Sequence, residues 1–174
     1  MPDYLIRPAT DADAAAIAAI YNHYVRNSTA TFDTEEKSVE DRIGWLAEHG
    51  DAHPVIVAED AGRVVAWGSL SRWGSRRAYR HSVEISVYVA AHATRLGLGP
   101  AMSEALIALG RDLGHHAIIS QIVSENEPSL KMSERLGFEN VGTLREVGRK
   151  FDRWLDLVLM ELVLVPPITD EIQP

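Results

Sequence analysis

The stretch VEISVYVAAHATRLGLGP at residues 83–100 predicts a strand, a glycine-containing turn and the start of a helix in direct succession. Its valine-rich first half favours extended backbone. The helix continues through Met102, Leu106 and Leu109 and stops near Gly114. Free N–H groups and a positive dipole end make a helix N-terminus suited to phosphate, and glycine allows close approach. The stretch therefore predicts a phosphate site, although two glycines at such a turn can also serve geometry alone.

Two common nucleotide-binding motifs do not fit this turn. No Gly-Lys-Ser/Thr sequence follows it, so it is not a P-loop. Met102 stands where the third glycine of G-x-G-x-x-G belongs, which argues against a dinucleotide fingerprint.

The segments on either side of this stretch predict an α/β (α+β) domain without regular βαβ alternation. Before it we expect a strand at residues 5–7, a helix capped by Thr10, a helix capped by Ser38, and strands at 55–59 and 64–70 joined through Gly62. After it we expect a buried strand of the parallel type at 117–123, a short helix with Gly137 as its C-cap, and a last strand at 154–165. The length of 174 residues indicates one domain, residues 1–165, and a flexible tail, residues 166–174.

Composition excludes several classes of protein. A formal net charge of −8 disfavours a nucleic-acid binder. No apolar run is long enough to span a membrane, and the N-terminus lacks signal-peptide features. The absence of cysteine excludes disulfides, thiolate metal sites and cysteine nucleophiles, which fits a cytoplasmic protein. We expect no metal site, because the histidines have no carboxylate at ligand spacing and His115 and His116 would point to opposite faces of a strand.

Several motifs occur together in a fixed order along the chain. They are IYN (20–22), NSTATF (27–32), AYRHSVE (78–84), SVYV (86–89), RLGLG (95–99), NEPS (126–129), RLGF (135–138) and KFDRWLD (150–156). The glycine turn resembles the pyrophosphate loop of the GNAT-superfamily acetyltransferases, Gln/Arg-x-x-Gly-x-Gly/Ala. From about residue 6 to 164 the chain most resembles the phosphinothricin and methionine-sulfoximine N-acetyltransferases. That resemblance implies a mixed, mostly antiparallel central sheet with helices on both faces, and a homodimer.

The resemblance also implies acetyl-CoA as co-substrate. The residues that it assigns to acetyl-CoA are Val87, Tyr88, Val89, Arg95, Leu96, Gly97, Leu98, Gly99, Pro100, Asn126 and Arg135. Backbone groups of residues 87–89 would pair with the pantetheine arm, and an N–H near Val87 would stabilise the oxyanion of the reaction.

Glu84 is the predicted general base, since an ammonium group must lose a proton before it can attack a thioester. From the sequence pattern alone, an outward-facing glutamate in solvent or in an ion pair is the alternative. The residues predicted to bind the acceptor are Phe32, Trp73, Arg76, Glu84, Ile85 and Ser86. Arg72 or Arg80 in the same loop could also pair with a second acidic group of the acceptor, although a solvated loop has the same composition. Trp154 is a further candidate wall of the pocket, or simply core.

The chain departs from the family pattern at four positions. Thr94 replaces the opening Gln or Arg of the signature, and Pro100 lacks an N–H. Gly74 stands where relatives carry a substrate-binding arginine, and Ser133 where many carry a Tyr or His that protonates the thiolate. The expected function is transfer of the acetyl group of acetyl-CoA to the amino group of a small amino-acid-like acceptor. The alternatives are another amine or a protein N-terminus as acceptor, or a non-catalytic acyl-CoA-binding module.

Overall fold

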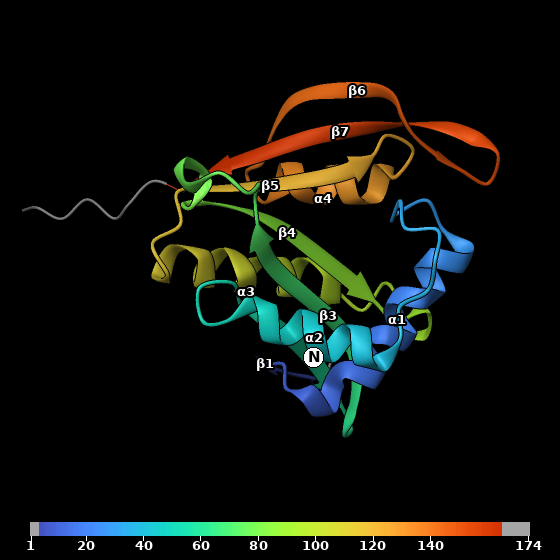
Figure 1. The fold of residues 1–174 in the computed structure, drawn as a ribbon, viewed down its shortest axis with the longest axis vertical. Coiled ribbons are helices and arrows are strands. Elements are labelled where there is room, and N and C mark those ends of the chain that lie inside the picture. Colours follow the sequence, from blue (N-terminus) through green and yellow to red (C-terminus); the bar gives the residue numbers. More distant parts are fainter. Residues whose placement is uncertain (1–3, 165–174) are drawn as a thin grey trace, which may run out of the picture.

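The computed structural model describes residues 4–164, so the tail expected at residues 166–174 lies outside the described residues. Its strands form one seven-stranded sheet in the order β1-β2-β3-β4-β5-β7-β6 (Figure 1). The strands are β1 (Tyr4–Pro8), β2 (Val55–Asp60), β3 (Arg63–Arg72), β4 (Ser82–Val89), β5 (Ala117–Val123), β6 (Glu139–Lys150) and β7 (Arg153–Val163). All neighbours are antiparallel except β4 and β5, so the sheet is mixed and mostly antiparallel, as expected.

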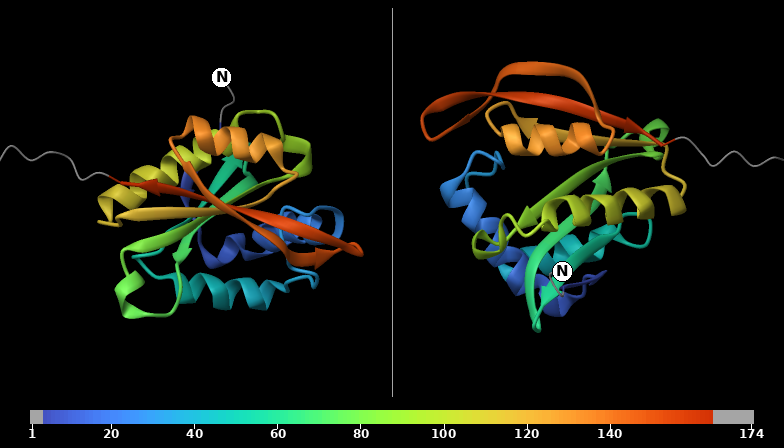
Figure 2. Two further views of the ribbon diagram at one scale, coloured as in Figure 1. Left: turned by 90° about the horizontal axis from the view of Figure 1, so that it is seen from above. Right: turned by 180° about the vertical axis from the view of Figure 1, so that it is seen from behind.

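Helices cover both faces of this sheet (Figure 2). They are α1 (Ala14–Asn27), α2 (Val39–His49), α3 (Leu98–Asp112) and α4 (Glu127–Arg135), with short 3₁₀ turns η1 (Asp11–Asp13), η2 (Arg77–Tyr79) and η3 (Ala91–Ala93). Successive residues of a strand point to opposite faces. On β3, Trp67 meets Tyr21 of α1 with ring centroids 5.9 Å apart, whereas a Cβ on Gly68 would lie 2.9 Å from Leu106 of α3. Helix α1 therefore packs on one face and α3 on the other.

The core is built from the apolar stripes of these helices and both faces of the central strands. Its largest fully buried side chains are Ile17, Trp67, Leu70, Met102, Leu106, Ile118 and Met160. Met102 and Leu106 are one helical turn apart, which explains why the spacing predicted this helix. No helix within residues 4–164 is long and apolar enough to cross a membrane.

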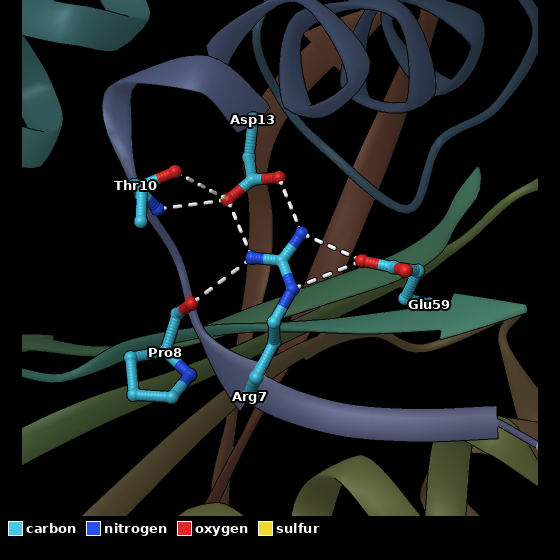
Figure 3. A network of polar contacts seen from close by, with 5 residues as sticks. All are labelled: Arg7, Pro8, Thr10, Asp13 and Glu59. Atoms are coloured by element: carbon cyan, nitrogen blue, oxygen red, sulfur yellow. Dashed lines mark hydrogen bonds and ion pairs between the residues drawn. The ribbon is translucent and has the colours of Figure 1, made fainter. Parts of the chain in front are cut away.

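Arg7 joins β1 to the start of α1 and to β2 (Figure 3). Its Nη1 and Nη2 donate to the two carboxylate oxygens of Asp13 at 2.8 and 2.9 Å. Its Nε and Nη2 also donate to Glu59 Oε2 at 3.0 and 2.8 Å. The backbone N–H of Thr10 donates to Asp13 as well, at 2.8 Å. Because these bonds favour the ionised carboxylate, chiefly those from Arg7, the pKa of Asp13 is lowered despite its burial.

Local signals in the sequence correctly placed several turns and caps. Ser38 accepts a hydrogen bond from the N–H of Asp41 at 3.0 Å, so it caps α2 as predicted. Gly62 has φ +78° in the two-residue turn between β2 and β3, and Gly137 has φ +91° just after α4. A positive φ of this size has a low energetic cost only for glycine.

The sequence prediction was wrong about the C-terminal part of the sheet. It missed β6 altogether and expected the last strand at residues 154–165, whereas β7 ends at Val163. β6 is the edge strand, and its side chains are mostly exposed, so it lacks the alternation that marks a half-buried strand. Two register shifts against β7 interrupt its pattern further.

Candidate active site

A cleft opens where β4 and β5 separate. These two strands pair in parallel only from Ser82↔Ala117 to Glu84↔Ile119. Beyond that point β4 continues along β3 and β5 along β7, as Figure 1 shows. The cleft has a volume of about 1090 Å³, and α3 and α4 line it together with the two strands. An extended ligand of the size of a coenzyme therefore has room between the strands.

The glycine turn forms one end of this cleft. Gly97 has φ +77° and caps α3, whose first residue is Leu98. The N–H groups of Leu98 and Gly99 belong to the first helical turn, where no intrahelical acceptor exists. Pro100 occupies the third helical position, so its missing N–H costs no helical hydrogen bond. A Cβ on Gly99 would lie 3.4 Å from the sulfur of Met132 in α4, so glycine keeps this passage open.

Most residues predicted to bind the cofactor do lie together around the cleft. Those that line it are Val87, Tyr88, Val89, Arg95, Gly97, Leu98, Gly99, Pro100, Asn126 and Arg135. Leu96 is the exception, with its side chain 51% exposed outside the lining. Asn126 caps α4 through Oδ1, which accepts from the N–H of Ser129 at 3.3 Å, and its Nδ2 is left for a ligand. The carbonyl of Val89 already accepts a hydrogen bond from Tyr24 at 2.7 Å.

Sequence reasoning missed part of the lining. Tyr24, Ser28 and Thr29 close the cleft from α1 and the loop that follows it. Tyr24 has the spacing of an apolar helix face, which does not distinguish a cleft residue from a core residue. Gln121 also lines the cleft, and the sequence carried a signal for it: it is the one amide in the strand AIISQIV, whose other residues are apolar except Ser120.

Glu84 is half-buried on β4 beside the cleft. Its Oε2 accepts a hydrogen bond of 2.9 Å from Gln121 Nε2 on β5, so Gln121 connects the carboxylate to the cleft lining. Burial raises the pKa of Glu84, and the bond from Gln121 opposes that rise. A carboxylate with a raised pKa beside a cleft is suited to accepting a proton near neutral pH.

A second, smaller cavity lies on the face that α1 and α2 cover. Its volume is about 320 Å³, and its lining is Tyr21, Asp33, Lys37, Arg42, Trp45, Trp67, Ser69, Ser71, Ser86 and Tyr88. Ser86 and Tyr88 of β4 also line the large cleft, so both spaces border this strand. Glu84 has the same parity as these two residues and therefore points to the same face.

The residues predicted to bind the acceptor are only partly brought together. Ser86 lines both spaces and Ile85 the large cleft. Phe32 instead packs its ring against Gly148 of β6. Glu84 is in neither cavity lining, although it neighbours Ile85 on β4. Also outside both linings are Trp73, the exposed arginines Arg72, Arg76 and Arg80, and Trp154, which is 62% exposed.

The histidines suggested no metal site, and within residues 4–164 no group of three or more His, Asp or Glu side chains is arranged to hold a metal ion. His115 is buried, and its Nε2 donates to the carbonyl of Ala52 at 2.7 Å. This hydrogen bond joins the segment after α3 to the loop before β2.

The cleft between the two strands, with a glycine-capped helix at its mouth, fits the acetyl-CoA-dependent acyltransferase that the sequence resemblance implies. Comparison with known proteins agrees, because residues 6–159 match the family described as acetyltransferase (GNAT) domain. The chain belongs to the GNAT acetyltransferase family.

Three relatives show where in that family it falls. An L-amino acid N-acyltransferase of Escherichia coli is 41% identical over 91% of this chain and 93% of its own length. An L-methionine sulfoximine/L-methionine sulfone acetyltransferase of Pseudomonas paraeruginosa is 40% identical over 92% and 95% of the two chains. The crystal structure of a phosphinothricin acetyltransferase from Sinorhizobium meliloti in complex with AcCoA superposes with a TM-score of 0.90 at 31% identity, covering 94% of this chain and 89% of that one.

Proposed function

We propose that this protein transfers the acetyl group of acetyl-CoA to the amino group of a small amino acid of the methionine sulfoximine, methionine sulfone or phosphinothricin class. The observation that carries the proposal is that the large cleft and the small cavity share Ser86 and Tyr88 in their linings, with Glu84 two residues before Ser86 on the same strand. One space suits an extended thioester and the other a small acceptor. The names of the relatives support the same pairing of donor and acceptor.

Acetyl-CoA fits the large cleft by size, and hydrogen-bond donors for its phosphates lie at one end. Its diphosphate would lie at the N-terminus of α3, where the N–H groups of Leu98 and Gly99 are free. The exposed guanidinium groups of Arg95 and Arg135 line the same cleft and would attract the phosphates. Thr94 replaces the usual opening residue of the signature and here donates its hydroxyl to the carbonyl of Ala91 at 3.2 Å, which shapes the turn.

Glu84 would take the proton from the acceptor ammonium, directly or through a water molecule. The free amine would then attack the thioester carbonyl, and a backbone N–H near Val87 would stabilise the oxyanion that forms. Ser133 is 4% exposed and lines the cleft, so its hydroxyl is available to protonate the departing thiolate. A CoA thiolate is a good leaving group, so a weak acid such as serine or water would suffice.

We also propose that the protein works as a homodimer. β6 is an edge strand and exposes Val141, Leu144 and Val147, and the adjoining hairpin exposes Phe151 and Trp154. An apolar, unpaired edge strand would favour aggregation in a monomer, and a second copy of the chain would cover it. The molar mass from light scattering tests this, and a monomer at micromolar concentration would contradict it. A cytoplasmic location stays a prediction from the sequence.

The test of function is steady-state release of CoA with a panel of amines. We expect turnover with methionine sulfone, methionine sulfoximine or phosphinothricin, and little with polyamines or peptide N-termini. If a peptide is the better acceptor, the small-molecule assignment is wrong. Acetyl-CoA binding by calorimetry without transfer to any amine would instead support the non-catalytic alternative.

A further inference from the structure

We propose that the small cavity is the subsite for an oxyanion of the acceptor, held by the guanidinium of Arg42 and the indole N–H of Trp67. This inference rests on the proposed function. It arises from an unusual coincidence: Arg42 Nε and Trp67 Nε1 are buried polar atoms without a hydrogen-bond partner in the described residues, and both side chains line this cavity. Buried donors are normally paired, so two orphans around one cavity indicate a missing acceptor.

Arg42 is a buried cation without a counterion. It is 7% exposed, and none of the ion pairs among residues 4–164 includes it. Its guanidinium carbon lies 5.0 Å from the ring centroids of both Tyr21 and Trp45, which hold it from two sides. A guanidinium stays charged even when burial lowers its pKa, so this position is costly unless an anion comes to it.

The only carboxylate in the cavity lining already has two partners. Asp33 accepts a hydrogen bond of 2.8 Å from the hydroxyl of Tyr21 and pairs with Lys37 at 3.1 Å. Two cationic side chains, Lys37 and Arg42, thus face one anionic side chain in the lining, which leaves one positive charge. A ligand with a single negative group would balance the cavity.

The rest of the lining suits a compact acid on a short chain. Trp67 is 2% exposed and stacks on Tyr88 with ring centroids 4.9 Å apart, so its N–H is fixed in direction. Ser71 donates to His49 Nε2 at 2.9 Å, while His49 Nδ1 donates to the carbonyl of Trp45 at 2.8 Å. These bonds place the hydroxyl group of Ser71 at the cavity wall in a defined orientation.

Cross-strand register connects this subsite to the proposed base. Ser71 lies opposite Glu84, and Ser69 lies opposite Ser86. One acceptor could therefore place its acid at Arg42, its short chain along the serines, and its ammonium at Glu84. A monoamine without an acidic group would leave both buried donors unpaired, so the subsite would exclude it.

The test compares acceptors in Arg42→Met, which keeps the volume between the two rings but removes the charge. The panel is methionine sulfone, phosphinothricin, and 3-(methylsulfonyl)propylamine, which is methionine sulfone without its carboxylate. We expect kcat/KM for methionine sulfone to fall by about 30-fold or more, the effect of losing a buried charge pair, with the KM for acetyl-CoA unchanged. The kcat/KM of Arg42→Lys for methionine sulfone should lie between those of the wild type and Arg42→Met. Trp67→Phe keeps an aromatic ring but loses the N–H, and it should lower this kcat/KM about fivefold.

The pattern of discrimination identifies the group that is bound. If the α-carboxylate occupies the subsite, Arg42→Met loses the preference for methionine sulfone over 3-(methylsulfonyl)propylamine. If the side-chain acid occupies it, the variant loses the preference for phosphinothricin over methionine sulfone instead. Retention of both preferences overturns the inference. Absence of turnover by the wild-type enzyme on all amino acids would be a failure of the proposed function and not of the subsite.

Thermal stability separates a binding role from a structural one. A buried charge without a partner destabilises the free protein, so Arg42→Met should melt at the wild-type temperature or above. Arg111→Met, at an exposed position on α3, is the matched control and should match wild type in both activity and melting temperature. A melting temperature well below that of the control, with equal loss on every acceptor, would mean that Arg42 only supports the fold.

Discussion

Gln121 Nε2 donates a hydrogen bond of 2.9 Å to Glu84 Oε2 and so joins the two strands where they begin to separate. Burial raises the pKa of this carboxyl, while the bond from Gln121 lowers it. The net effect is a raised pKa, which makes this carboxylate a stronger base than one in solvent and so suits it to general-base work.

Replacing Glu84 by Gln should reduce turnover because the proton acceptor is lost while the shape is kept. We expect kcat to fall by about ten- to ten-thousand-fold, with the Kd for acetyl-CoA nearly unchanged. Single-turnover acetylation and calorimetry measure the two quantities. Unchanged activity at neutral pH would exclude Glu84 as the base.

Replacing Gln121 by Leu should shift the pH profile without removing the base. Since the hydrogen bond from Gln121 lowers the pKa of Glu84, its loss should raise that pKa further. The wild-type kcat/KM should fall as pH drops through the raised pKa of Glu84, and in Gln121→Leu that fall should begin at higher pH. An acidic limb at the same pH in both proteins would mean that another group titrates.

Gly99→Val should weaken acetyl-CoA binding because the added methyl groups would crowd the passage between Gly99 and Met132. Steric overlap of this kind costs about 1–3 kcal/mol, which corresponds to a rise in Kd of about 5- to 150-fold. Calorimetry with CoA measures it. The KM for the acceptor is the internal control, and an equal rise in both constants would point to general distortion.

The central stretch and its phosphate turn could be predicted because their signals are local. The valine-rich strand, the glycines and the helical spacing of Met102 and Leu106 are each read within a few residues. The capping by Ser38 is local too. Local chemistry therefore predicted the strand, the turn and the phosphate site, whereas the family resemblance supplied the other residues around the large cleft.

The burial of Arg42 and the formation of β6 depend on tertiary contacts, which the neighbouring sequence does not indicate. Arg42 lies three residues from Trp45 on a helix whose sequence predicts an ordinary polar face, yet packing against Tyr21 buries it. The strand β6 forms only because β7 offers it an edge, and its own pattern is broken by Gly142 and Gly148. Neither feature follows from periodicity alone.

Gly68→Ala should destabilise the fold, since no side chain fits between β3 and α3. An added Cβ would lie 2.9 Å from both Leu106 Cδ1 and the carbonyl oxygen of Ser86. Overpacking of this kind costs about 1–3 kcal/mol in the free energy of unfolding. Gly44→Ala on α2 has nothing within 4 Å and is the matched control, expected to gain about 0.5–1 kcal/mol because alanine favours the helix. Urea denaturation measures both, and equal effects would contradict the packing argument.

Asp13→Asn should reduce stability at neutral pH but not in acid. The pKa of Asp13 is lowered in the folded protein, so its contribution is full above its unfolded pKa and is lost as pH falls through the folded value. Hydrogen bonds to charged groups contribute about 1.5–3 kcal/mol, which sets the expected loss at pH 7. The difference between wild type and variant should narrow below about pH 4. Asp112→Asn, at an exposed site, should show no such convergence.

Lys150→Met should loosen the loop that closes the large cleft. Lys150 is 5% exposed, and its Nζ donates to the carbonyls of Ser28 at 2.7 Å, Thr31 at 2.8 Å and Tyr24 at 3.4 Å. Without the ammonium the carbonyls of Ser28 and Thr31 lose their donor, whereas that of Tyr24 keeps the N–H of Ser28. Each buried acceptor left unpaired costs about 1–3 kcal/mol. Because Ser28 and Tyr24 also line the cleft, we expect a lower melting temperature together with a higher KM for acetyl-CoA.

Hydrogen exchange locates that effect in Lys150→Met. Amides of residues 28–33 should exchange faster, while those of α3 stay protected. Lys131→Met is the matched control, because Lys131 is exposed and pairs only with Glu127 at 3.2 Å, a contact that contributes less than about 0.5 kcal/mol. If Lys150→Met exchanges like the control throughout the loop, water satisfies the carbonyls of Ser28 and Thr31 and the lysine does not hold this loop in place.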